Sequence, residues 1–247
     1  MFRTTKKLFQ PRKPTMTAFN IDIVSDPVCP FCYLGKKRLD RAIDVYQKTI
    51  PGGSEDVFNI TCKLQLLAPL FLTFWKPFYL DPTLPKGKSM PVQERMAQKF
   101  GADRVGMMNE RMRMMGQSEG ICFSFQGKIG NTRDAHRLSQ LAKTKGPDVQ
   151  SKLMAALMHS YFEESGDVTS HDMLLDAAEK AGLDRAEAKG WLDEGKGGEE
   201  VDKAVEWAYA KGIQGVPHFI INDRFEIGGA QDVEAFLGEF VRAKSAA

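Results

Sequence analysis

The stretch SDPVCPFCYLG (residues 25–35) joins a predicted strand to a predicted helix and carries two cysteines, Cys29 and Cys32. The preceding residues 19–24 alternate in polarity and are β-branched, which is typical of a strand. Apolar residues at helical spacing follow the cysteines until about residue 50. The cysteines are therefore expected at a helix N-terminus, above the carboxyl edge of a sheet. Such a C-x-x-C pair can be a redox pair, half of a zinc site or two thiols without chemistry.

The predicted position of the two thiols favours redox chemistry. A thiol at a helix N-terminus faces unsatisfied backbone N–H groups and the positive end of the helix dipole, and both stabilise a thiolate. We expect Cys29 to be exposed and to act as the attacking sulfur, and Cys32, one turn inside, to be buried and to resolve the mixed disulfide. Asp26, three residues before Cys29, would oppose the thiolate if its side chain lies close.

A zinc site would need further ligands near the pair. The other two cysteines, Cys62 and Cys122, and the four histidines are scattered without a second close pair, so no metal site is predicted. The hypothesis that the two thiols have no chemistry is made less plausible by a distant segment, GIQGVPHF (residues 212–219). There Pro217 opens a predicted strand directly after Val216, which makes this peptide bond a candidate for the cis form.

The remaining elements indicate a sheet interrupted by helices. Residues 57–68 are apolar and β-branched and predict a second strand, and residues 217–229 predict a hairpin around Asn222-Asp223, followed by a last helix. Six or seven helices are expected between about residues 91 and 212. The fold class is therefore α/β, with a mixed sheet in the order βαβ then ββα and a large all-α insertion.

These elements divide the chain into a sheet domain, an insertion and an N-terminal segment. The sheet domain comprises residues 19–75 and 213–247, the helical insertion residues 76–212, and a leader or disordered tail residues 1–18. With 247 residues and four cysteines, the chain can bury a core without disulfides. The formal net charge of +2 argues against nucleic acid as the main partner, and no apolar run is long enough for a membrane span.

The first twenty residues contain five Lys or Arg, two Pro and no acid. They lack the apolar stretch of a secretory signal, so a cytoplasmic location is expected, with a mitochondrial presequence as the alternative. In such a reducing compartment the cysteine pair should rest as a dithiol. Reduction or isomerisation of disulfides is then favoured over net oxidation.

Four segments together resemble the DsbA-like thioredoxin family, specifically its FrnE-type members. They are SDPVCPFCYLGKKRL (25–39), FWKPFYLDP (74–82), NTRDAHRL (131–138) and GVPHFIINDRFEIGGAQ (215–231), and the resemblance covers nearly all of the chain after Phe19. It implies a thioredoxin fold in which a cis-proline loop lies beside the cysteine pair. It also implies that Val216 and Pro217 offer backbone groups to the substrate, as in strand addition.

The resemblance implies a protein disulfide oxidoreductase without a tightly bound cofactor. Its partners would be thiols or disulfides of proteins or small molecules, with glutathione as a candidate co-substrate. Phe31 takes the place of a histidine of the DsbA type, so a strongly oxidising pair is not expected. Phe31, Trp75 and Asn131 are predicted substrate contacts, although Trp75 and Asn131 could equally serve core packing and helix capping.

Two other functions stay open. Kappa-class glutathione transferases and hydroxychromene-carboxylate isomerases share the architecture and carry serine at the place of Cys29. A glutathione-dependent isomerase or transferase is therefore the alternative, and residues 228–232 at the start of the last helix could hold a glutathione carboxylate. A non-catalytic binding module is the third hypothesis. The methionines of residues 107–115 are interpreted as core rather than substrate surface.

Overall fold

The computed structural model describes residues 17–56 and 73–246. Its main sheet has the order β2-β1-β5-β6, with β1 (Ile21–Ser25) parallel to β2 (Thr73–Pro77). Strand β5 (His218–Ile221) is antiparallel to β1 and to β6 (Phe225–Gly228). The predicted mixed sheet is confirmed, and residues far apart in the sequence meet in it.

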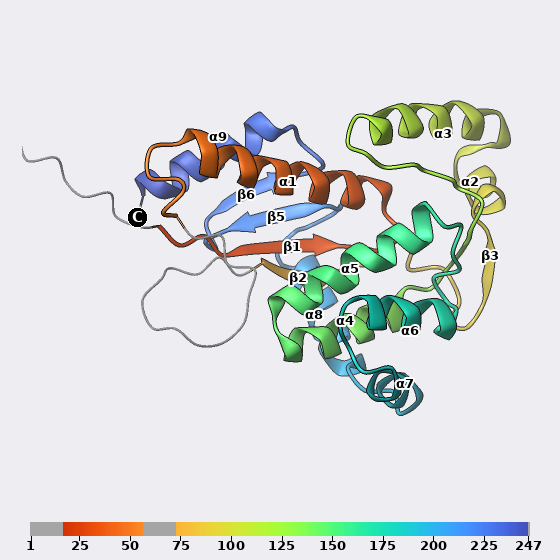
Figure 1. Ribbon diagram of the computed structural model, residues 1–247. Coiled ribbons are helices and arrows are strands. Elements are labelled where there is room, and N and C mark those ends of the chain that lie inside the picture. The colour runs from red at the N-terminus through yellow and green to blue at the C-terminus, as the bar shows by residue number, and fades with distance from the viewer. Residues whose placement is uncertain (1–16, 57–72, 247) are drawn as a thin grey trace, which may run out of the picture.

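Side chains alternate between the two faces of this sheet, and helices cover both (Figure 1). Helix α1 (Pro30–Thr49) and helix α9 (Val233–Ser245) lie on one face, where Phe19, Tyr46 and Phe240 pack edge to face at centroid distances of 5.4–5.6 Å. On the other face, Val24 packs in a smaller cluster with Ala208 of α8. The segment with Cys29 and Cys32 thus begins a helix that is held by core contacts along its length.

The insertion contains seven helices and a small two-stranded sheet. Strands β3 (Ser89–Pro91) and β4 (Lys128–Gly130) pair antiparallel, so the insertion is not purely helical as predicted. The helices are α2 (Val92–Phe100), α3 (Ala102–Gln117), α4 (Arg133–Lys145), α5 (Pro147–Phe162), α6 (His171–Lys180), α7 (Arg185–Asp193) and α8 (Gly198–Ala210). Short isolated strands carry little sequence signal, which explains why β3 and β4 were missed.

The NTRDAHRL segment fastens the insertion. Arg137 donates to the carbonyl oxygens of Trp191, Leu192 and Lys196 at 2.8–2.9 Å, which caps the C-terminal end of α7. Arg133 forms an ion pair with Asp202 and so ties α4 to α8. These bonds hold three helices of the insertion in one arrangement.

A second set of bonds joins the insertion to the sheet. Gln150 of α5 accepts from the backbone N–H of Trp75 at 3.2 Å and donates to its carbonyl at 3.1 Å, so α5 pairs with the edge strand β2. The ring of His136 on α4 bonds the carbonyl oxygen of Phe78 at 3.0 Å, immediately after β2. Helices α4 and α5 are therefore held in a fixed position relative to the main sheet.

The second predicted strand, residues 57–68, lies outside the described residues. Strand β2 instead occupies Thr73–Pro77, within a proline- and aromatic-rich segment that was not predicted as a strand. Proline is tolerated here because β2 is an edge strand. The domain boundary after residue 75 stays a prediction, although β2 continues two residues beyond it. Within the described ranges, no helix is long and apolar enough to cross a membrane.

Candidate active site

Cys29 is the N-cap residue of α1, and Cys32 lies one turn inside the helix. The N–H of Cys29 donates to Asp26 at 3.0 Å, and its carbonyl accepts from the N–H of Cys32 at 3.0 Å. Pro30 fills the first helical position, where its missing N–H costs nothing. Both cysteines are free thiols. The predicted arrangement at the helix N-terminus is thereby confirmed.

The expectation that Cys29 is exposed was wrong. Only 2% of Cys29 and 1% of Cys32 is accessible to solvent. Cys29 is covered because the loop before β5 packs over it: its thiol donates to the carbonyl oxygen of Val216 at 3.6 Å, across 187 positions of sequence. The Val216–Pro217 peptide bond is cis. The predicted partners of the pair, Val216 and Pro217, thus lie beside it.

Gly35 allows this close approach of α1 and the proline loop. A Cβ at position 35 would lie 3.0 Å from Pro217 Cγ and 3.0 Å from Phe219 Cζ, closer than ordinary packing allows. The carbonyl of Pro217 is held from the other side by the N–H of Gly229, at 2.8 Å. A glycine one turn after Cys32 therefore sets how near the loop comes to the thiols.

Asp26 is fully buried directly before the pair. Its carboxylate accepts from the backbone N–H groups of Leu80 at 2.7 Å and Val28 at 3.2 Å and from the Thr132 hydroxyl at 3.4 Å. Burial raises the pKa of Asp26 to about 7, against the effect of these hydrogen bonds. Burial also raises the pKa of the Cys32 thiol, and its neighbour Cys29 acts in the same direction. At neutral pH, Cys32 is therefore protonated and Asp26 is near its midpoint.

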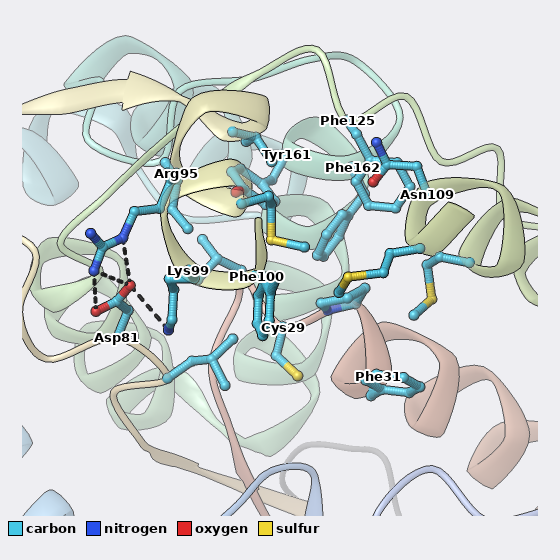
Figure 2. A pocket seen from close by; sticks show the side chains of 18 of the residues that line it. Cys29, Phe31, Asp81, Arg95, Lys99, Phe100, Asn109, Phe125, Tyr161 and Phe162 are labelled. Carbon is cyan, nitrogen blue, oxygen red and sulfur yellow. Dashed lines mark hydrogen bonds and ion pairs between the residues drawn. The ribbon is translucent and has the colours of Figure 1, made fainter. Parts of the chain in front are cut away.

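A pocket of about 270 Å³ opens beside Cys29 (Figure 2). Val28, Cys29, Phe31 and Val216 form its side toward the sheet domain. The insertion supplies the other walls from α2, α3, α5, β4 and the segment before β4, chiefly Met96, Met108, Met112, Phe125, Ile129 and Phe162. The pocket thus lies between the two parts of the chain, and Cys29 is part of its wall.

One wall of the pocket is charged. Asp81 accepts from Arg95 through both carboxylate oxygens, at 2.9 and 3.0 Å, and from Lys99 at 3.3 Å (Figure 2). Burial alone would raise the pKa of Asp81, but hydrogen bonds from Thr83, Arg95 and Lys99 lower it below its usual value. Asp81 is therefore ionised at neutral pH, and two cations share its charge.

The predicted contact residues divide into two groups. Phe31 is 44% exposed at the pocket, where Val216 also lies. Trp75 is buried in the core, and Asn131 donates to the Leu84 carbonyl at 3.0 Å and accepts from the Arg133 N–H at 3.0 Å. Neither Trp75 nor Asn131 is among the pocket-lining residues, so the packing and capping interpretations account for them and their substrate role stays a prediction.

Sequence reasoning missed the residues that the insertion contributes. The methionines of α3 are not simply core, because Met107 is 71% exposed while Met108 and Met112 line the pocket. Arg95 and Lys99 are four apart on α2, a spacing that places them on one helix face and could have suggested a shared partner. Cys122 is an exposed free thiol, and Cys62 lies outside the described residues.

His218 is half-buried at the start of β5 and pairs with Glu226 at 3.0 Å, in accord with a strand position. In the part of the chain that the structure describes, no cluster of three or more His, Cys, Asp or Glu could hold a metal ion. Residues 228–232, predicted as a carboxylate site, lie at the end of β6 and before α9. Gly228 and Gln231 line a second cavity, which shares no lining residue with the one beside Cys29.

Comparisons with known proteins agree with this architecture. The family model of the DSBA-like thioredoxin domain matches residues 20–241. The uncharacterized protein YwbO of Bacillus subtilis is 26% identical over 216 residues, which cover 85% of this chain and 90% of that protein.

Two solved structures share the fold. A probable DsbA oxidoreductase of Streptomyces coelicolor aligns with a TM-score of 0.75 and 24% identity over 93% of this chain and 91% of that chain. A 2-hydroxychromene-2-carboxylate isomerase aligns with a TM-score of 0.59 and 15% identity over 92% and 98%, respectively. Since the family match spans most of its residues, this chain belongs to the DSBA-like thioredoxin domain family.

Proposed function

We propose that the protein is a thiol–disulfide oxidoreductase whose redox pair is Cys29 and Cys32. The observation that carries the proposal is the position of two free thiols one helical turn apart at the N-terminus of α1, with Cys29 on the wall of a pocket. The helix dipole and the free N–H groups of the first turn favour a thiolate at the N-cap position. Cys32 has no such access to the pocket and suits the resolving role.

The reaction follows from this geometry. The Cys29 thiolate attacks one sulfur of the substrate disulfide, the substrate S–S bond breaks, and the departing sulfur takes up a proton. Cys32 then loses its proton and attacks the Cys29 sulfur, which breaks the mixed disulfide and releases the second thiol. Two electrons have passed from the dithiol to the substrate. The reverse sequence would form a disulfide in the substrate.

The protonation state of Asp26 affects how readily a thiolate forms in the pair. An ionised carboxylate in the same buried region would disfavour a thiolate, since like charges repel strongly where water is excluded. Because the pKa of Asp26 is about 7, the carboxyl group can be neutral when a thiolate forms. In molecules in which Asp26 carries this proton, the conflict that the sequence suggested between Asp26 and the pair is absent.

No tightly bound cofactor is needed for this chemistry, because the dithiol itself supplies both electrons. A small thiol such as glutathione would restore the dithiol, two glutathione molecules forming one glutathione disulfide. In a reducing cytoplasm or mitochondrion the pair would rest reduced and act as a reductase or isomerase. Both locations stay predictions, since residues 1–16 lie outside the described part of the chain.

The test is thiol trapping by mass spectrometry across a series of glutathione redox buffers. Wild type should form a Cys29–Cys32 disulfide, and Cys32→Ser should accumulate an adduct on Cys29. Cys122→Ser is the matched control, because it removes an exposed free thiol on the insertion, outside the pair. If no Cys29–Cys32 disulfide forms in any buffer, the proposal is wrong.

A glutathione-dependent isomerase or transferase is the second candidate, favoured by the enclosed pocket beside Cys29. It needs glutathione bound at position 29 but no second thiol. Cys32→Ser would then keep full activity and reversible glutathione binding, whereas the oxidoreductase loses turnover.

A further inference from the structure

We propose, on the basis of the oxidoreductase function above, that the substrate is a disulfide of small apolar thiols that carry an anionic group. Its apolar part would occupy the pocket between Cys29 and the insertion, and its anionic group would lie at Lys99. Three features of the pocket support this: the access to Cys29, the apolar walls and the unbalanced charge on α2.

The first feature is access. Cys29 is 2% exposed, and it is part of the wall of a cavity of about 270 Å³. A disulfide that enters this cavity therefore lies directly beside Cys29. The cavity is larger than the roughly 150 Å³ that holds one benzene and close to the lower end of the 300–1,000 Å³ typical of ligand pockets. It therefore suits a molecule of one or two rings better than a polypeptide loop.

The second feature is the apolar wall. Three methionines, Met96, Met108 and Met112, line the pocket, and their flexible thioethers can adapt to ligands of different shape. At the mouth, Phe31 and Phe100 are 44% and 42% exposed, so the apolar surface extends out to solvent. Such exposed aromatic groups beside a reactive thiol favour a substrate with an apolar body.

The third feature is a positive charge that is not balanced. Figure 2 shows Arg95, Asp81 and Lys99 together on one side of the pocket and Phe31 on the other, with Cys29 between them. Arg95 binds Asp81 through both carboxylate oxygens, so these two charges cancel. The Lys99 ammonium has three donors, and among the described residues it has one bond recorded, to Asp81 at 3.3 Å. Two cations against one carboxylate leave one positive charge on this wall.

The reaction balances with such a substrate. Cys29 attacks one of the two sulfurs, the first small thiol leaves with a proton, and Cys32 displaces the second while the Cys29–Cys32 disulfide forms. Both electrons come from the enzyme dithiol. Each product is an apolar thiol that carries one anionic group, and each can leave through the mouth of the pocket.

The test is a single-turnover measurement with pre-reduced enzyme and two aromatic disulfides of similar size. Dithiobis-nitrobenzoate carries one carboxylate on each ring, and dithiodipyridine is neutral. Lys99→Gln should lower kcat/KM for the carboxylated disulfide about fivefold, the size expected for a partly exposed ion pair, and change the neutral one less than twofold. Lys189→Gln on α7 is the matched control, since it removes an exposed lysine far along the insertion and should change neither rate.

A second comparison tests the preference for an apolar substrate body and uses only the wild-type protein. For each disulfide, kcat/KM with the enzyme is divided by the rate constant of the same disulfide with dithiothreitol, which corrects for its intrinsic reactivity. This ratio should be higher for both aromatic disulfides than for oxidised glutathione or a disulfide-bonded peptide. If the peptide is preferred, or if Lys99→Gln affects both aromatic disulfides equally, the substrate inference is wrong while the redox pair stands. Failure to form the Cys29–Cys32 disulfide would instead overturn the proposed function itself.

Discussion

Replacing Asp26 by asparagine should lower the stability of the protein at pH 4 and raise it at pH 8. Burial raises the pKa of Asp26 from 3.8 to about 7 in the folded protein. The folded state therefore binds this proton more tightly than the unfolded state does. As pH rises from about 4 to about 7, the wild type loses stability, and above pH 7 the full loss is present.

The magnitude follows from the two pKa values. A rise of roughly three in pKa corresponds to about 4 kcal/mol of unfolding free energy. Asparagine removes this cost, but its single carbonyl cannot accept from Val28 and Leu80 together as the two carboxylate oxygens do. One buried donor left unpaired costs about 1–3 kcal/mol. Wild type loses only about 0.5 kcal/mol of this stability by pH 4 and nearly all of it by pH 8. Asp26→Asn should therefore be less stable than wild type by about 0.5–2.5 kcal/mol at pH 4 and more stable by about 1–3 kcal/mol at pH 8.

The assay is urea unfolding of the reduced protein at four pH values, with the difference between variant and wild type plotted against pH. Asp193→Asn is the control, because this exposed carboxylate on α7 should give a difference that is small and independent of pH. A flat difference curve for Asp26→Asn would refute the reasoning, since it would mean that the buried carboxyl group does not titrate near neutrality in the folded state.

Three further predictions concern how the site is held. Gly35→Ala should destabilise the protein by up to about 2 kcal/mol, because the new methyl group would lie only 3.0 Å from Pro217 Cγ, and the better helix propensity of alanine offsets part of that cost. It should also slow Cys29 alkylation by iodoacetamide; an unchanged urea midpoint and rate would contradict this. Burial lowers the pKa of His136 to about 4, so this residue alone costs about 3 kcal/mol of stability as pH falls from 6.5 to 4, while Asp26 acts in the opposite direction. The stability of His136→Asn relative to wild type should therefore rise by about 3 kcal/mol over that range in urea unfolding, and a constant difference would contradict this. Arg137→Lys should cost about 2–3 kcal/mol in urea unfolding, because one ammonium cannot replace a guanidinium that binds three carbonyls; a loss below 0.5 kcal/mol would show that the cap is dispensable.

The parts of the fold that were predicted correctly have local signals. The hairpin of β5 and β6 was predicted from Asn222-Asp223, and both residues have positive φ values, 51° and 55°, as the tight hairpin turn requires. The start of α1 was predicted from Cys29-Pro30, and the structure has its N-cap at Cys29. In each case a short run of residues specifies its own backbone conformation.

The parts that were missed depend on residues far apart in the sequence. Strand β2 escaped prediction because Pro77 and the aromatic residues before it hide the alternation, and only pairing with β1 makes this segment a strand. The burial of Cys29 comes from Val216, 187 positions away. The methionines of α3 have the spacing of a core face, and only the packing of α2 and α3 around the cavity makes two of them pocket walls. No local pattern encodes these outcomes.

The division between local and distant signals has a functional consequence. The residues to which we assign the chemistry, Cys29, Cys32 and Asp26, belong to one continuous segment at the end of β1 and the start of α1. Most residues that line the pocket beside Cys29 belong to the insertion. Arg137 joins helices within the insertion, and Gln150 joins the insertion to β2; neither contact involves the cysteine pair. The walls contributed by α2 and α3 can therefore change without altering the bonds that hold the thiols. If the proposed function holds, reactivity and substrate choice are therefore separable in this architecture, and Lys99 lies on the side that can vary.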